Sequence, residues 1–264
     1  MGQRQDLVIF NDHSVFSKKL LCNGVNTVVV LTSMQATQAS WAINVLMESY
    51  LFGYPVSLNS EQKSGTLEVD PQAYVTVASM VHGTSWFQST FNKLQVNSSH
   101  YTIVDMLTDF VKMTNGKSAD KILKSLADMF PDKPESSLIV LEQPELLLLL
   151  VPNLSADMLS SKFINVLRKK CALLVVNTVT DSVQVENDTA PASEFKRFLQ
   201  TNIFKSNVVL SLSPLPTGRA KDVTGTLRIT RGPKSFEGFI PEIHVVENEY
   251  LYLTERETTK LFYS

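Results

Sequence analysis

The segment S-L-I-V-L-E-Q-P-E-L-L-L-L-L-V, residues 137–151, sets the organisation of the rest of the chain. It begins with a run of branched apolar residues at 138–141, and this run stops abruptly at Glu142. Pro144 lacks a backbone donor and disfavours helix at Gln143, so we expect the strand to end here and the chain to turn. A strand that is apolar on both faces is typical of the middle of a parallel sheet covered by helices. An acidic residue at the tip of such a strand stands where nucleotide-hydrolysing folds hold a metal-organising carboxylate.

Strand and helix patterns alternate on both sides of this segment. The sequence predicts strands at residues 7–10, 26–31, 74–79, 101–106 and 171–177, and helices at about 40–51, 85–94, 118–130, 155–169 and 193–203. After residue 207 strands follow one another without helices, at 208–213, 223–230, 243–247 and 250–253. This order predicts an α/β fold with a mostly parallel central sheet flanked by helices and extended by C-terminal antiparallel hairpins. No internal repeat or low-complexity linker divides the chain, so we expect a single domain over residues 1–264.

The composition excludes several classes of protein. With a formal net charge of -2, the isolated chain is not expected to bind nucleic acid strongly, because phosphate contacts need clustered Lys and Arg. The only cysteines, Cys22 and Cys171, lie far apart and beside no paired histidine motif, which excludes a disulfide framework and a recognisable zinc site. The four histidines are scattered, and we interpret them as surface or packing residues rather than metal ligands.

The sequence also bears on location. The N-terminus has no secretory apolar core and does not fit the myristoylation pattern. The longest apolar stretch is interrupted by Glu142, Pro144 and Glu145, well short of the ~18 residues needed to span a membrane. We therefore predict a soluble intracellular protein in the cytoplasm, with a nuclear location left open.

The helix predicted around residues 41–51 has an unusually wide apolar stripe. Apolar residues repeat at four-residue spacing and others stand beside them, which indicates burial against the sheet and against a second surface. We expect Trp41 at the start of this helix to contribute to an interface with a partner.

A phosphate-binding P-loop would have to follow the strand at 26–31, within residues 32–40, T-S-M-Q-A-T-Q-A-S. Such a loop needs glycines, so that backbone N–H groups can wrap the phosphates, and a lysine to neutralise them. This segment contains neither. The single G-K-S triplet, residues 116–118, follows a polar loop and is interpreted as the start of a helix. We therefore interpret Glu142 as a strand-end carboxylate that meets a backbone donor or solvent, and we expect no base, metal or substrate pocket to support its pairing with Glu145.

One cluster of positive charge remains, between residues 214 and 234. Arg219 and Lys221 follow Gly218 on a predicted tight loop, and Arg231 stands beside a glycine at the next turn. A solvated hairpin edge that resists aggregation explains such charges. The alternative is contact with an RNA backbone, with this segment forming one part of a multi-subunit surface.

Four blocks of sequence resemble one family closely, the sixth subunit of the Elongator complex, particularly its fungal members. They are Q-R-Q-D-L-V-I-F at 3–10, L-E-Q-P-E-L-L-L at 141–148, A-K-D-V-T-G-T-L-R-I-T-R-G at 220–232, and H-V-V-E-N-E-Y-L-Y-L-T-E-R-E-T-T-K-L-F-Y-S at 244–264. The resemblance covers essentially the whole chain. It implies a RecA-like fold and assembly with Elongator subunits four and five into a hexameric ring holding two copies of each. It also implies association with the catalytic half of Elongator, tRNA binding by the ring during wobble-uridine modification, and ATP hydrolysis at the level of the ring.

Our leading hypothesis is therefore a non-catalytic RecA-like ring subunit that lacks a P-loop, with no cofactor or metal of its own. By analogy with pore loops of RecA-like rings, residues 181–192 and 215–224 are candidates to face the ring centre, and only the second loop is basic. The candidate RNA-binding residues are Arg219, Lys221 and Arg231. The candidate partner-interface residues are Trp41, Tyr250, Tyr252, Phe262 and Tyr263.

We expect the aromatic C-terminal segment to be more exposed than a terminal strand of a monomer, so that deleting residues 260–264 costs assembly more than folding. The alternative hypothesis is an NTPase with an unorthodox phosphate site in which Glu142 organises a metal.

Overall fold

A computed structural model describes residues 26–34, 37–58, 67–114, 116–181, 190–218, 220–236, 247–256 and 258–263. Within these residues the chain forms a nine-stranded sheet in the order β3-β2-β4-β5-β1-β6-β7-β8-β9. The strands are β1 (Thr27–Ser33), β2 (Tyr74–Ser79), β3 (Tyr101–Asp105), β4 (Lys133–Glu142), β5 (Cys171–Val179), β6 (Val208–Pro214), β7 (Gly225–Arg231), β8 (Asn248–Thr254) and β9 (Thr259–Tyr263). Strands β1 to β6 pair in parallel, and β6 to β9 pair antiparallel. The predicted arrangement of the sheet is therefore confirmed.

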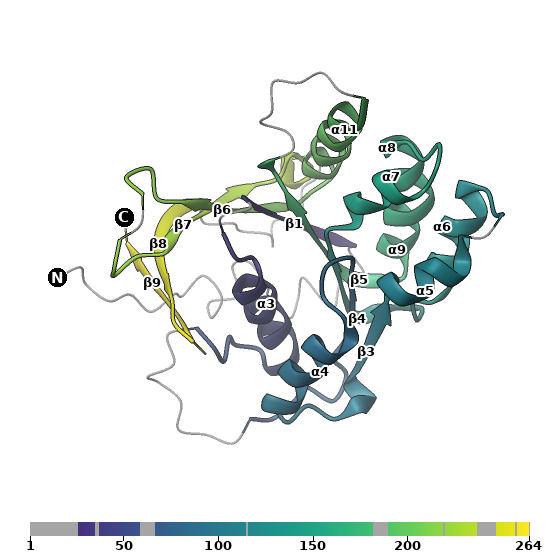
Figure 1. Cartoon of the computed structure of the whole chain (residues 1–264). Helices are drawn as coiled ribbons and strands as arrows, with labels where there is room; N and C mark the ends of the chain where they lie inside the picture. The colour runs from purple at the N-terminus through teal and green to yellow at the C-terminus, as the bar shows by residue number, and fades with distance from the viewer. Residues whose placement is uncertain are drawn as a thin grey trace.

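Helices cover both faces of the parallel part of the sheet (Figure 1). The helices are α3 (Ser40–Phe52), α4 (Thr84–Lys93), α5 (Met106–Met113), α6 (Ala119–Asp128), α7 (Leu147–Leu150), α8 (Ala156–Leu159), α9 (Asn165–Lys169) and α11 (Ala190–Phe204). A π-helical turn, Ser160–Ile164, joins α8 to α9. Neighbouring residues of β1 contribute to different cores: Val29 and Leu31 pack on the side of α3 and α4, while Val28 and Val30 pack on the side of α5 to α11. This two-sided burial explains why the central strands are continuously apolar.

Helix α3 is enclosed by the sheet itself. Eleven of its thirteen residues are buried, and the antiparallel strands β7 to β9 curl around the side of the helix that faces away from β4 and β5 (Figure 1). The helix ends at Gly53, whose φ of 77° places it in the left-handed conformation that glycine adopts without strain. The wide apolar stripe does contact two surfaces, but both of these surfaces belong to this same chain.

Several boundaries differ from those predicted. Strand β4 begins five residues earlier than its apolar run, with a register shift between Lys133 and Leu138, because pairing with β5 continues past the apolar residues. Helix α5 and strand β9 were not predicted from the sequence. The predicted strand at 7–10 and almost all of that at 243–247 lie outside the described residues. No helix in the described part of the chain combines the length and apolarity needed to cross a membrane.

Candidate functional site

The carboxyl ends of β2, β4 and β5 bring a small polar group together around Glu142. Ser79 Oγ donates to Glu142 Oε2 over 2.5 Å, and His82 Nδ1 lies 2.9 Å from the same oxygen. Ser79 Oγ in turn accepts from the backbone N–H groups of Val81 and His82. Only 4% of Glu142 is exposed, so its carboxylate is held inside the protein by side chains from the neighbouring strand end.

The turn after Glu142 is fixed by the backbone. Gln143 adopts a left-handed conformation with φ of 51°, and its N–H donates to Asn177 O over 2.9 Å. Pro144 then begins a 3-10 turn, which ends the strand as predicted. Glu145 is buried, and its carboxylate accepts a hydrogen bond from the N–H of Val179. Burial raises the pKa of Glu145 to about 7, because the hydrogen bonds that lower this pKa do not offset the loss of solvation, and the negative charge of Glu142 adds a smaller increase.

A pocket of about 540 Å³ opens at this edge of the sheet. Its wall includes Glu142, Asn177, Trp86 and residues at the start of α3, and the His82 ring stacks on Trp86 with ring centroids 4.6 Å apart. A histidine and a pocket therefore do stand beside Glu142, whereas the expectation that no substrate pocket supports its pairing with Glu145 stays a prediction. His82 was not predicted as a site residue, because only the pairing of β2 with β4 brings residues 79–82 beside residue 142.

The pocket nevertheless offers no P-loop. Within residues 32–40, Thr32 and Ser33 complete β1, residues 35–36 lie outside the described residues, and Ala39 occupies the N-cap of α3 without a side-chain cap. The triplet at 116–118 precedes α6, with Ser118 at its N-cap, so its interpretation as a helix start is confirmed. Among the described residues no group of three His, Cys, Asp or Glu side chains could hold a metal ion.

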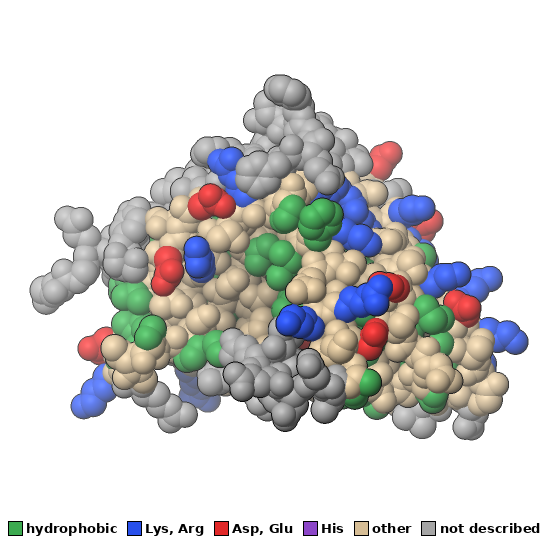
Figure 2. All heavy atoms as spheres, turned by 90° about the horizontal axis from the view of Figure 1, so that it is seen from above, with side chains coloured by type: hydrophobic (Ala, Val, Ile, Leu, Met, Phe, Trp, Pro, Cys, Tyr) green, Lys and Arg blue, Asp and Glu red, His purple; other side chains and the backbone are tan. Residues whose placement is uncertain are grey.

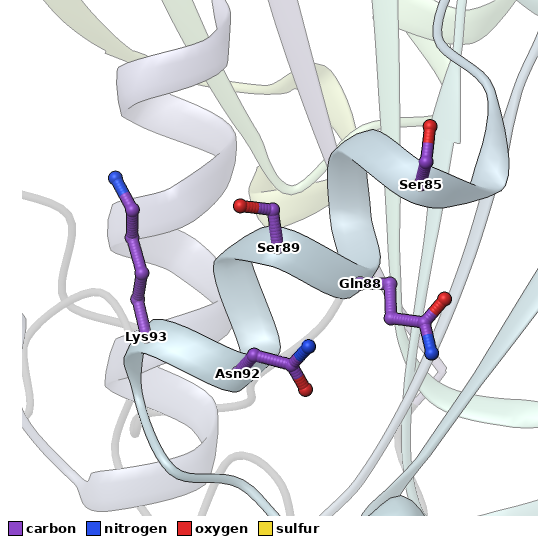
Figure 3. Close-up of a pocket in the computed structure, with 5 residues that line it drawn as sticks. All are labelled: Ser85, Gln88, Ser89, Asn92 and Lys93. Carbon is purple, nitrogen blue, oxygen red and sulfur yellow. The ribbon is translucent and has the colours of Figure 1, made fainter.

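A second depression, of about 470 Å³, lies on the outer face of α4 (Figure 3). All five lining residues come from this one helix: Ser85, Gln88, Ser89, Asn92 and Lys93. Binding pockets usually gather polar groups from several elements into a concave, largely apolar site. This surface lacks that convergence, and we assign it no ligand.

The structure separates the cationic residues that stand close together in the sequence. Lys221 lies in the turn between β6 and β7, at the same edge of the sheet as Glu142. Arg231 is the last residue of β7, so it lies at the other end of this seven-residue strand, roughly 20 Å from the β6–β7 turn. Its backbone N–H donates to Glu247 Oε1. Arg219 lies outside the described residues. Lys221 and Arg231 therefore do not form one compact patch.

Three of the five candidate interface aromatics lie in the core. Trp41, Tyr250 and Tyr252 are 7%, 3% and 0% exposed, and the rings of Trp41 and Tyr252 pack with centroids 5.0 Å apart. The expected exposure of Tyr250 and Tyr252 is therefore wrong, and Trp41, expected at a partner interface, is buried within this chain as well. Strands β8 and β9 turn alternate side chains towards α3, and Tyr250 and Tyr252 fall on that inner face.

Phe262 is half-buried and follows the core residue Leu261, so alternation places it on the outer face of β9. The register pairs Tyr263 with Tyr250. A role in a partner interface stays a prediction for Phe262 and Tyr263. The expectation about deleting residues 260–264 must also change, because Leu261 is fully buried and its loss would damage the core.

Comparison with known proteins accounts for this architecture. No protein-family model matches the chain. Over 269 aligned residues the chain is 38% identical to Elongator complex protein 6 of Saccharomyces cerevisiae, and the match covers 99% of this chain and 98% of that protein. The crystal structure of the flagellar accessory protein FlaH from Methanocaldococcus jannaschii superposes over the full length of both chains with a TM-score of 0.57 and 13% identity. A KaiC-like protein from Pyrococcus horikoshii covers 99% of this chain and is fully covered in turn, with a TM-score of 0.47 and 11% identity.

These similarities carry different weights. At 13% identity the FlaH match shows only that the two proteins share a fold. The yeast match is far above that level and extends over nearly every residue of both chains, as the four sequence blocks led us to expect. The chain belongs to the Elongator complex protein 6 family.

Proposed function

We propose that this chain is a non-catalytic RecA-like subunit of Elongator. In this proposal it forms a heterohexameric ring with Elongator subunits four and five, two copies of each, and the ring binds tRNA and supports wobble-uridine modification together with the catalytic half of the complex. The proposal that the chain is non-catalytic rests on the surroundings of the Glu142 carboxylate. Its carboxylate is buried and bonded to Ser79 and His82, while the β1 end that precedes α3 supplies no lysine or glycine among the described residues.

A hydrolytic function is the alternative, because Glu142 and His82 do line a pocket. The two functions differ in the behaviour of the chain on its own. We expect the isolated chain to hydrolyse no ATP, and a Glu142→Gln variant to assemble as the unmodified chain does. Turnover by the isolated chain that disappears in Glu142→Gln would establish the NTPase instead.

Ring formation is tested by measuring the molecular mass of the chain alone and mixed with its two expected partners. The proposal requires a species of six subunits only in the mixture. The residue to change at the candidate interface is Phe262, because it lies on the outer face of β9 and its truncation leaves the core intact. We expect Phe262→Ala to weaken assembly and to leave the fold of the chain unchanged, since aromatic anchors dominate interface energetics. Assembly unaffected by this change would remove Phe262 from the interface.

Contact with tRNA is proposed at the β6–β7 turn, which carries Arg219 and Lys221. Replacing both with Ala should weaken tRNA binding by the assembled ring and reduce the slope of log affinity against log salt, because fewer counterions are released. Arg231→Ala serves as a comparison from the opposite edge of the sheet. If the double variant keeps the salt slope of the unmodified ring, this turn does not contact the phosphate backbone.

A further inference from the structure

The helices on the face of the sheet opposite α3 carry an excess of positive charge. We use the term helical layer for α6, the continuous stretch from α8 to α9, and α11, together with α7, which contacts α11. Its charged residues number seven Lys or Arg against four Asp or Glu. The basic residues are Lys121, Lys124, Lys162, Arg168, Lys169, Lys196 and Arg197, and the acidic ones are Asp120, Asp128, Asp157 and Glu194. The helical layer therefore bears a formal charge of +3 (7 - 4) in a chain whose formal net charge is -2.

Most of the acidic groups in the helical layer already have partners within it. Asp120 lies 3.8 Å from Lys162, and Asp157 accepts two hydrogen bonds from Arg197. Glu194 accepts from a backbone N–H at the start of α8. Each of the two ion pairs cancels one positive and one negative charge, so five basic residues remain against Asp128 and Glu194, and the helical layer keeps its excess of positive charge.

The same layer holds most of the exposed apolar side chains. Of the six large apolar side chains that are exposed among the described residues, four lie here: Leu149, Leu150, Val166 and Phe204. Phe204 is 65% exposed at the end of α11, and the next residue, Lys205, lies with its Nζ 3.5 Å from Asn165 Oδ1 beside Val166. Figure 2 shows Lys and Arg side chains over the side of the molecule that carries these helices, with Asp, Glu and apolar side chains among them. A contiguous exposed apolar patch marks an interaction site, and the Lys205–Asn165 contact brings Phe204 and Val166 together as the start of such a patch.

We propose that the helical layer is a docking surface for an acidic protein segment that carries apolar side chains. Carboxylates of the segment pair with the lysines of α6, α9 and α11, and its apolar side chains cover Leu149, Leu150, Val166 and Phe204. The four apolar side chains favour a protein partner over RNA, because a phosphate backbone offers them no apolar surface to bury. This surface is separate from the β6–β7 turn proposed for tRNA, so either proposal can fail alone.

The test measures binding of the full chain to three labelled probes by fluorescence anisotropy. The first is a helical peptide of Glu and Leu with its leucines along one face, the second is polyglutamate of equal length, and the third is single-stranded poly(U) RNA. We expect the Glu–Leu peptide to bind most tightly. The double variant Lys169→Glu with Lys196→Glu should weaken its binding by about tenfold or more, since each reversed charge replaces attraction with repulsion. Phe204→Ser should weaken it several-fold by removing an apolar anchor.

Matched variants elsewhere on the chain control for charge and apolarity. Lys93→Glu with Arg228→Glu reverses two exposed charges, one on α4 and one on β7, and Val81→Ser changes an exposed apolar residue away from the helical layer. Both should leave peptide binding unchanged. The proposal is overturned if no probe binds, if the control variants weaken binding as much as the test variants, or if poly(U) binds most tightly and Phe204→Ser has no effect. Concentration-dependent self-association that Lys169→Glu with Lys196→Glu abolishes would instead assign the surface to a second copy of this chain.

Discussion

The enclosure of α3 by the C-terminal strands makes a quantitative prediction about Tyr252. Its side chain is fully buried between β8 and α3 and packs against Trp41. Replacing it with Ala removes a large aromatic side chain from a packed core, which costs about 3–5 kcal/mol. Because the free energy of unfolding of a whole domain is only about 5–15 kcal/mol, Tyr252→Ala should remove a large share of the stability of the isolated chain.

The assay is urea unfolding of the isolated chain, followed by the fluorescence of its two tryptophans, Trp41 beside Tyr252 and Trp86 on α4. The matched control is Phe262→Ala, an aromatic truncation on the outer face of the neighbouring strand, which should cost less than about 1 kcal/mol in the absence of partners. Equal losses of stability in the two variants would refute the division of the C-terminal aromatics into an inner and an outer set. A Tyr252→Ala variant as stable as the unmodified chain would refute the closure of β8 over α3.

Three further predictions concern other parts of the fold. Burial raises the pKa of Glu145 to about 7, above the 4.5 of an unperturbed carboxyl, so the folded state binds the proton more tightly than the unfolded state. The free energy of unfolding should therefore fall by up to ~3 kcal/mol as pH rises from 4.5 to 7 and then level off. In urea unfolding over the same pH range, Glu145→Gln should lack this decrease. The Lys170 ammonium donates to two carbonyls at the end of α6, so Lys170→Met should cost about 1–3 kcal/mol in urea unfolding, while Lys124→Met on the exposed side of α6 should cost less than about 0.5. A methyl group at Gly232 would overlap the backbone of residue 206, so Gly232→Ala should lower thermal stability by about 1–3 kcal/mol, whereas Gly83→Ala, with open space around it, should not.

The sequence by itself determined most of the elements and the kind of fold. The strands at 74–79 and 171–177 were predicted without tertiary information, because short runs rich in β-branched residues are typical of a sheet covered on both faces. Residues 32–40 already showed that a glycine-based phosphate cradle is missing, since that cradle depends on local backbone freedom. The four family-specific sequence blocks likewise identify the family through residue identities alone, whatever the order of the strands in the sheet.

The tertiary structure alone decided which side chains meet. Ser79 and His82 reach Glu142 although about 60 residues separate them along the chain, because β2 pairs with β4, and strand order is not written in the sequence of either strand. The basic residues after position 214 are close in sequence, but Lys221 precedes strand β7 and Arg231 ends it, so the extended strand separates them. Register and curvature turned Tyr250 and Tyr252 towards α3 rather than towards solvent. A pattern of residue types fixes what each element is, whereas its neighbours and the face it presents depend on contacts between segments far apart in the chain.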